Sequence, residues 1–213
     1  MLLVRALHAT ATSEGEIVTK ATQQGTPRES IVRAATVLFG RESFPATSMR
    51  DIASEVGILA GSLYAHIDGK ESLLLEIIEE GIGEFLEAVS AASEQPGPAV
   101  ERLRAMMRAH VEVVSRDPLK TQIVFHQWRY LGEDNRRRVR AKRSRYEDLF
   151  REVIEAGVAD GSFDAATDVR VAVLSTLGSL NWTSEWISAE GPTPVEELSL
   201  RLADTMLNGI IKR

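Results

Sequence analysis

Apolar side chains recur at every third or fourth position along most of the chain from Thr26 onward. This spacing places them on one face of an α-helix, whereas a half-buried β-strand would alternate with a period of two. We find no segment with a convincing period of two. The 213-residue chain also contains no cysteine, which excludes disulfide bonds, thiolate metal sites and a cysteine nucleophile. The pattern therefore predicts an all-α fold of about nine helices.

Proline, glycine and capping residues divide this pattern into separate helices. The expected helices begin at Thr26, near Thr47, at Leu59 and at Lys70, and then occupy about 98–116, 118–131, 133–160, 167–187 and 193–211. Residues 1–25 show no sustained periodicity and are expected to be a disordered tail. The predicted organisation is this tail, a three-helix N-terminal domain at 26–72, and a larger helical domain at 73–213.

The second and third expected helices are short, and a tight turn that contains Gly57 joins them. The helix before them carries an apolar face of its own between Ile31 and Phe39. This arrangement is typical of a helix-turn-helix, whose second helix enters the major groove of DNA. Residues 26–72 are therefore a candidate DNA-binding head.

The head resembles the TetR (tetracycline repressor) family of bacterial transcriptional regulators. The resemblance covers about residues 28–75 and rests on the segments 31–39, 47, 50–53, 57–58, 61–66 and 70–73. It implies a DNA-binding head followed by a helical ligand chamber and a dimer interface. The sequence departs from the family pattern at Ser43, Leu59 and Ile67, where glycine, serine and phenylalanine are usual. We expect a different turn at Ser43 and no side-chain cap on the third helix, at a cost of about 1 kcal/mol.

Several residues of the head are suited to phosphate contact. Thr47 and Ser48 lie at a helix N-terminus, where free backbone N–H groups favour an anion, while Tyr64 and His66 are uncharged donors and Lys70 is a charged one. The resemblance implies the same role for these places; the alternative is that Tyr64 and His66 only cap the three-helix core. The residues expected to contact DNA are Thr47, Ser48, Arg50, Leu59, Ala60, Gly61, Ser62, Tyr64, His66 and Lys70.

The overall charge does not predict DNA binding. The chain has a net charge of −6, so a basic coat is absent and any contact must come from the local motif. The third helix lacks an arginine for bidentate guanine readout. Base recognition is therefore expected from small contacts, from Arg50 at the groove edge, or from DNA shape.

The C-terminal domain is far longer than DNA binding requires. Polar groups stand among large aromatic residues in its sequence, as in apolar pockets that orient a ligand with few donors. The expected ligand-binding residues are Met107, His110, Phe125, Gln127, Trp128, Tyr146, Leu177, Asn181 and Trp182. The alternative for each is ordinary core packing, and a buried core histidine is the more usual role for His110.

A closer resemblance concerns the effector. The segments 57–64, 128–131 and 181–186 are similar to the branch of the family that senses CoA thioesters and represses fatty-acid or steroid breakdown. That resemblance implies a fatty-acyl-CoA or steroid-CoA effector; a different hydrophobic effector, of the drug-efflux type, is the alternative. Seven cations between Arg136 and Arg145 could bind CoA phosphates, form a solvated face relieved by nearby acidic residues, or contact DNA without specificity.

The last two helices suggest self-association. The expected helix at 193–211 has two apolar stripes, one through Leu198 and Leu202 and one through Ala203, Leu207 and Ile210, while the preceding helix is rich in small residues. One stripe would serve the core and the other a partner, so we expect a homodimer through these two helices.

Other function classes lack their signatures. We find no P-loop, no dinucleotide fingerprint, no His-Glu-x-x-His and no Gly-x-Ser-x-Gly, so we expect no enzyme, no cofactor and no metal site. A helical scaffold would explain the helices but not the set Tyr64, His66 and Lys70. No apolar run reaches the length of a membrane span, and we expect a cytoplasmic protein.

Overall fold

A computed structural model describes residues 26–187, 191 and 193–208 of the chain. These residues form nine α-helices and three short helical turns. No strand forms in these residues, which confirms the all-α prediction. The expected tail at 1–25 and the expected end of the last helix beyond 208 lie outside the described residues. The α-helices are α1 (Pro27–Glu42), α2 (Met49–Val56), α3 (Ala60–Leu63), α4 (Lys70–Ser93), α5 (Ala99–Arg116), α6 (Pro118–Gln122), α7 (Glu133–Ala159), α8 (Val169–Trp182) and α9 (Val195–Leu207).

Side-chain caps explain where the helices of the head begin and end. Thr26 and Glu29 form a capping box before α1, and Ser48 and Asp51 form a second one before α2. Each box satisfies backbone N–H groups that have no partner within the helix. Gly57 ends α2 in the left-handed conformation that glycine adopts at little cost.

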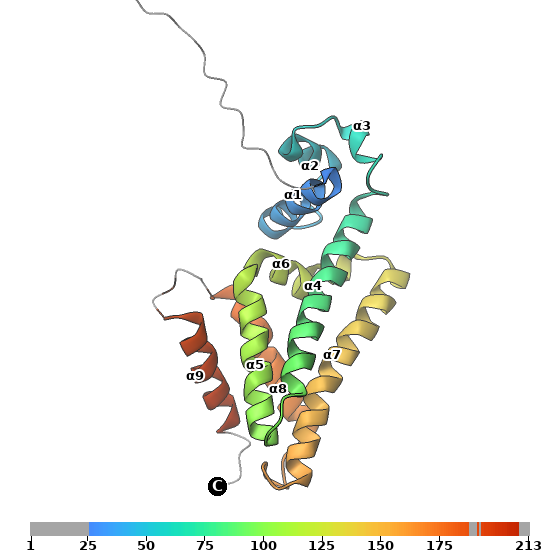
Figure 1. Cartoon of the computed structure of the whole chain (residues 1–213). Coiled ribbons are helices and arrows are strands. Elements are labelled where there is room, and N and C mark those ends of the chain that lie inside the picture. Colours follow the sequence, from blue (N-terminus) through green and yellow to red (C-terminus); the bar gives the residue numbers. More distant parts are fainter. Residues whose placement is uncertain (1–25, 188–190, 192, 209–213) are drawn as a thin grey trace, which may run out of the picture.

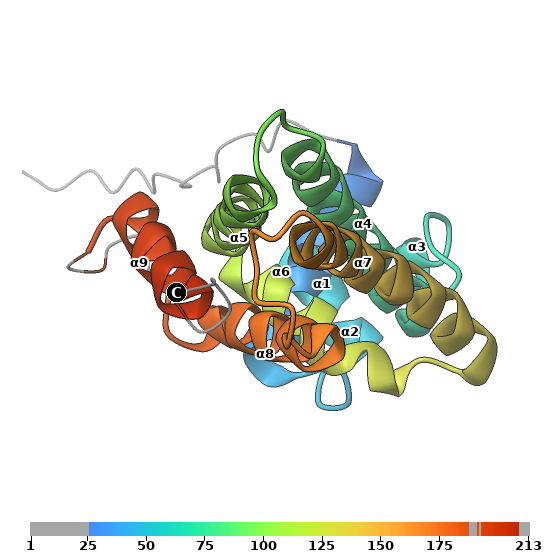
Figure 2. The same ribbon diagram turned by 90° about the horizontal axis from the view of Figure 1, so that it is seen from below.

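The head sits on one end of the helical body, and α4 runs from the head along the body (Figure 1). Helix α4 packs against α5 and α7, and α9 packs against α5. Viewed along the bundle, α8 and α9 lie at the periphery (Figure 2). Helix α4 is therefore a continuous link between the exposed end of the head and the interior of the body.

Two apolar clusters form the core, one in the body and one beneath the head. The cluster beneath the head joins α1–α4 to Ile123, Val124, Leu131 and Val139 of the body. The head is thus packed onto the segment that follows α6. A domain boundary at residue 72 stays a prediction, because α4 passes through it without a break.

Three expected helices are shorter than predicted. Helix α3 spans only Ala60–Leu63, because its first turn has no side-chain cap at Leu59 and contains Gly61. The expected helix at 118–131 changes at residue 123 into a π-helical turn (Ile123–Gln127) and then a 3-10 turn (Trp128–Tyr130). Helix α8 gives way to a 3-10 turn at Thr183–Glu185.

Ser43 holds the turn after α1 in an unusual conformation. Its φ of 74° and ψ of 157° lie in a region that glycine adopts far more readily than residues with a Cβ. Among the described residues it is the only non-glycine with positive φ. Strain of this kind persists only where the surroundings fix it, so contacts from neighbouring segments must hold this turn in place.

None of the helices in residues 26–208 that the structure describes is long and apolar enough to span a bilayer.

Candidate functional site

The end of the head farthest from the body exposes the residues around α3 (Figure 1). The Tyr64 side chain is 59% exposed and that of Leu59 is 80% exposed. Gly61, Ser62 and His66 are also exposed. Among the described residues the Tyr64 hydroxyl has no hydrogen-bond partner, and the phosphate contact expected of it stays a prediction.

Ser48 and Thr47 have separate roles at the start of α2. Ser48 is the exposed N-cap, and its Oγ accepts a hydrogen bond from the Asp51 backbone N–H. Thr47 is only 3% exposed, and its hydroxyl donates to the Ser43 carbonyl at 3.0 Å. The Thr47 side chain therefore stabilises the turn from within, and a DNA contact at Thr47 stays a prediction that its hydroxyl does not support.

Lys70 is also occupied inside the head. Its Nζ donates to the carbonyl oxygens of Phe44 and Thr47, each at 2.8 Å, and lies 4.3 Å from the centre of the Phe44 ring. Two of its three N–H groups are therefore used to hold the turn between α1 and α2. The phosphate contact expected of Lys70 stays a prediction, and it would use the third N–H.

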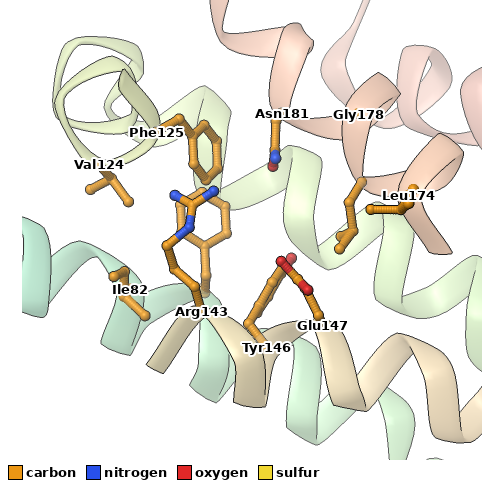
Figure 3. Close-up of a pocket in the computed structure, with 11 residues that line it drawn as sticks. Ile82, Val124, Phe125, Arg143, Tyr146, Glu147, Leu174, Gly178 and Asn181 are labelled. Atoms are coloured by element: carbon orange, nitrogen blue, oxygen red, sulfur yellow. The ribbon is translucent and has the colours of Figure 1, made fainter. Parts of the chain in front are cut away.

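A cavity of about 250 Å³ lies in the body between α4, the π-helical turn, α7 and α8. Figure 3 shows its wall. The lining residues are Ile82, Phe85, Val124, Phe125, Arg143, Tyr146, Glu147, Leu174, Leu177, Gly178 and Asn181. Phe125, Tyr146, Leu177 and Asn181, which were predicted to bind a ligand, are brought together here.

Arg143 is the cation of this otherwise largely apolar wall. Its guanidinium reaches toward Phe125 (Figure 3) and lies 5.3 Å from the centre of the Trp128 ring. Burial lowers the pKa of Arg143 below its usual range, while the charge of Glu147 opposes that shift. Asn181 adds a buried Oδ1 that accepts no hydrogen bond from the described residues. The pocket thus presents a partly desolvated positive charge and an unused amide oxygen.

A buried pair lies behind the aromatic wall. His110 Nδ1 lies 2.6 Å from the Tyr146 hydroxyl, and the imidazole packs against the rings of Phe85 and Phe125. Burial lowers the pKa of His110 from 6.5 to about 3 and raises that of Tyr146. Both groups are therefore neutral near pH 7. The Nδ1 of a neutral imidazole can accept a hydrogen bond from the Tyr146 hydroxyl.

Comparison with known proteins decides the family. Residues 31–77 match the family "Bacterial regulatory proteins, tetR family", and residues 96–210, more than half of the chain, match "Tetracyclin repressor-like, C-terminal domain". The chain belongs to the TetR family. It is 30% identical over 194 residues to the HTH-type transcriptional repressor KstR2 of Rhodococcus jostii, with 86% of this chain and 90% of that protein covered. This TetR-family chain is accordingly a transcriptional regulator and not an enzyme.

Two solved structures with the same fold are similar along nearly their whole length. The TetR-family regulator PfmR of Thermus thermophilus is 30% identical, with a TM-score of 0.78, and the alignment covers 86% of this chain and 99% of that one. The regulator AibR, in complex with isovaleryl coenzyme A and operator DNA, is 28% identical, with a TM-score of 0.75 over 86% of this chain and 97% of that one.

Five of the nine predicted ligand residues of this TetR-family body do not line the pocket. Met107 and His110 are buried in the core behind it, so the core role weighed for His110 is the one observed. Gln127 turns its side chain to the head, with hydrogen bonds to Phe39 and Phe44.

The two tryptophans are also elsewhere. Trp128 packs under the guanidinium groups of Arg140 and Arg143, and Trp182 is 60% exposed on the outside of α8. Helical spacing places Trp182 on the opposite side of α8 from Leu180, which is fully buried in the core. Their aromatic character alone did not reveal which way they point.

The cluster of cations on α7 is mostly neutralised. Five of the seven have ion pairs: Arg136 and Arg140 with Glu133, Arg137 with Asp134, and Arg138 and Lys142 with Glu79. These exposed pairs support the interpretation of a solvated, charge-balanced face. Sequence reasoning therefore missed the particular role of Arg143, although its spacing from Tyr146 on one helix places both on the same side.

Proposed function

We propose that this regulator is a repressor that binds a palindromic DNA operator as a homodimer and leaves it when an apolar effector with an anionic part enters the pocket. A fatty-acyl-CoA or steroid-CoA thioester is the effector class that fits best. The observation that carries the proposal is the cavity wall itself, in which Arg143 stands among apolar side chains with the unused Asn181 Oδ1 nearby.

The size and charge of the cavity narrow the effector. At about 250 Å³ it lies just below the range of roughly 300–1,000 Å³ usual for small-molecule pockets. It suits the acyl part of a thioester, with the bulky CoA part left at the mouth. The similar structure of AibR, a complex with isovaleryl coenzyme A, supports the same class.

Helix α8 supports the proposed dimer. Val171, Leu174, Trp182 and Trp186 are large apolar residues that remain between 46% and 60% exposed on α8 and the turn after it. On α9, Ala203 and Leu207 are buried against the body, so less of α9 is free than the two stripes suggested. A second copy would cover the exposed face of α8 with the same face, as twofold symmetry requires. The two heads would then bind half-sites roughly 34–36 Å apart.

Helix α4 offers a route from the pocket to the DNA. Ile82 and Phe85 of α4 line the cavity, and Lys70 begins the same helix in the head. An effector that prefers the DNA-incompetent arrangement by about 1.4 kcal/mol would weaken operator binding tenfold. The proposal therefore needs only a modest difference in effector affinity between the two arrangements. A displacement of α4 would express it by changing the distance between the two heads of the dimer.

The DNA-contact assignment predicts different results for Tyr64 and Lys70. Tyr64→Phe should weaken binding to every operator sequence by about five- to tenfold and leave thermal stability unchanged, because it removes an exposed hydroxyl that positions the head on phosphate. Lys70→Met should weaken binding and also lower the melting temperature, because Phe44 and Thr47 lose their shared donor.

Fluorescence anisotropy with a labelled fragment from upstream of the protein's own gene, at several salt concentrations, measures the first effect and thermal unfolding measures the second. Gly83→Ala, at an exposed site on α4 with open space around the glycine, is the matched control. If the protein did not bind this fragment at any salt concentration, the result would favour a helical scaffold over a DNA-binding regulator. A change in base preference without loss of affinity would contradict the role given to Tyr64.

A further inference from the structure

The side chain of Gln127 forms a direct hydrogen-bonded link between the body and the head. Its Oε1 accepts a hydrogen bond from the Phe44 backbone N–H at 2.7 Å, and its Nε2 donates to the Phe39 carbonyl at 2.7 Å. The partners are 83 and 88 residues away in sequence. Gln127 is 9% exposed, so water competes weakly for either bond. One amide group therefore bridges the end of α1 and the turn that follows it.

The turn held by Gln127 is the one that sets α2 in place. Ser43, with its positive φ, lies between Phe39 and Phe44, and the Phe44 carbonyl accepts from Lys70 Nζ at 2.8 Å. The Phe44 ring also stacks on Tyr130, which follows Gln127 by three residues. Phe44 is thus fixed by the body on two sides and by the first residue of α4 on a third.

Gln127 is at the end of a helical turn that also lines the pocket. Val124 and Phe125, three and two residues earlier, belong to the wall of the cavity, and all three lie in the π-helical turn Ile123–Gln127. A π-helical turn carries one extra residue per turn and is frequent at functional sites. A displacement of Phe125 by an effector would therefore be passed to Gln127 along a few bonds of backbone.

Close packing leaves this turn little room to absorb such a displacement. A Cβ on Gly81 of α4 would stand 2.5 Å from Val124 Cγ2, so the backbone of α4 lies directly against the turn. On the other side, Leu119 of α6 packs against Gly40 of α1. Densely packed elements move as units rather than deform, so a displacement of this turn would be passed to the elements packed against it, the head among them.

We propose that Gln127 is the positioning residue that couples the effector pocket to the helix-turn-helix. Its amide holds the turn between α1 and α2 in the arrangement seen here, and occupation of the pocket acts on the same π-helical turn through Val124 and Phe125. This inference deepens the proposed function and rests on it. It does not depend on which effector is bound, because the contact with the pocket wall is made by apolar side chains.

Hydrogen exchange tests the link without any effector. Gln127→Met keeps the length of the side chain but removes both hydrogen bonds, and it should speed amide exchange in the segment 40–48 by at least about tenfold. Gln122→Met is the matched control, since the Gln122 side chain donates to the Ser184 carbonyl, which belongs to the body and not to the head. Gln127→Glu retains an acceptor for the Phe44 N–H and should recover part of the protection, which also covers the case in which Gln127→Met does not fold.

A double-mutant cycle tests the coupling to the pocket. Phe125→Leu alters the cavity wall and should change exchange in the segment 40–48, but in the Gln127→Met background that change should fall at least about threefold. Equal exchange in Gln127→Met and Gln122→Met, or equal effects of Phe125→Leu in both backgrounds, would overturn the proposal. These results do not require operator binding, so a failure of the proposed function would appear separately, as absent binding of the wild-type protein to the upstream fragment.

Discussion

A protein with Val171→Glu and Trp182→Glu is expected to be folded but monomeric, with operator affinity lower by at least about 100-fold. Both side chains are more than half exposed on α8, so the fold itself does not need them. Four carboxylates at a twofold interface would repel one another and lose the apolar contact. A monomer binds one half-site, and joining two binding modules commonly contributes a factor of 10²–10⁴ in affinity.

Sedimentation velocity gives the oligomeric state, and anisotropy with the full operator gives the affinity. Ala141→Glu with Ser144→Glu is the matched control, because it places the same two charges at exposed positions of α7. A double variant that stays dimeric would show that the dimer uses another surface. A monomeric variant with unchanged operator affinity would contradict the need for two heads.

Acidification from pH 7 to pH 5 should destabilise the protein by about 2 kcal/mol through His110 alone. The folded-state pKa of His110 is lowered to about 3 by burial, whereas in the unfolded chain it is near 6.5. Between these values the unfolded state binds the proton and the folded state does not. Stability from this group is therefore fully present above pH 6.5 and is lost as the pH falls toward 3.

Denaturant unfolding at pH 7, 6 and 5 measures this dependence. His110→Gln keeps a neutral hydrogen-bonding partner for the Tyr146 hydroxyl and should flatten the curve over this range. The carboxylates whose pKa values are lowered, Asp51, Glu71 and Asp160, lose their contribution only at more acidic pH. An equal pH dependence in the wild type and in His110→Gln would contradict the buried neutral imidazole.

Periodicity and local capping predicted most of the helices in the described residues. Thr26 with Pro27 and Ser48 with Asp51 carry their own start signals, and Gly57 carries a stop signal, so these ends were readable from a few neighbouring residues. The π-helical turn at 123–127 was not readable, because its sequence continues an ordinary helical pattern. This turn packs against Gly81 of α4, and its last residue, Gln127, forms hydrogen bonds with the head. Both are contacts between distant segments, which the local sequence does not reveal.

The candidate site was harder to predict than the fold. The sequence pattern put Tyr146 and Asn181 among the expected ligand residues, and both line the cavity. The pattern did not distinguish Arg143, which lines the cavity, from the paired cations of α7. Arg138 and Lys142 pair with Glu79, which lies on another helix and could not be identified as their partner from spacing along α7. Nor did the pattern show that Lys70 and Gln127 form hydrogen bonds with backbone groups at the end of α1 and in the turn that follows it. Contacts between distant segments decide such roles.

The most direct test of the central claim is a titration of the protein–operator complex with acyl-CoA thioesters of increasing chain length, a steroid-CoA thioester and the matching free acids, followed by anisotropy. We expect at least one thioester to release the operator at concentrations about tenfold or more below its free acid. Arg143→Met should raise the required concentration about tenfold without changing operator affinity in the absence of effector, because the guanidinium faces the pocket and not the head. Release by the free acid at the same concentration would contradict recognition of the CoA part, and release by none of these compounds would contradict the proposed effector class.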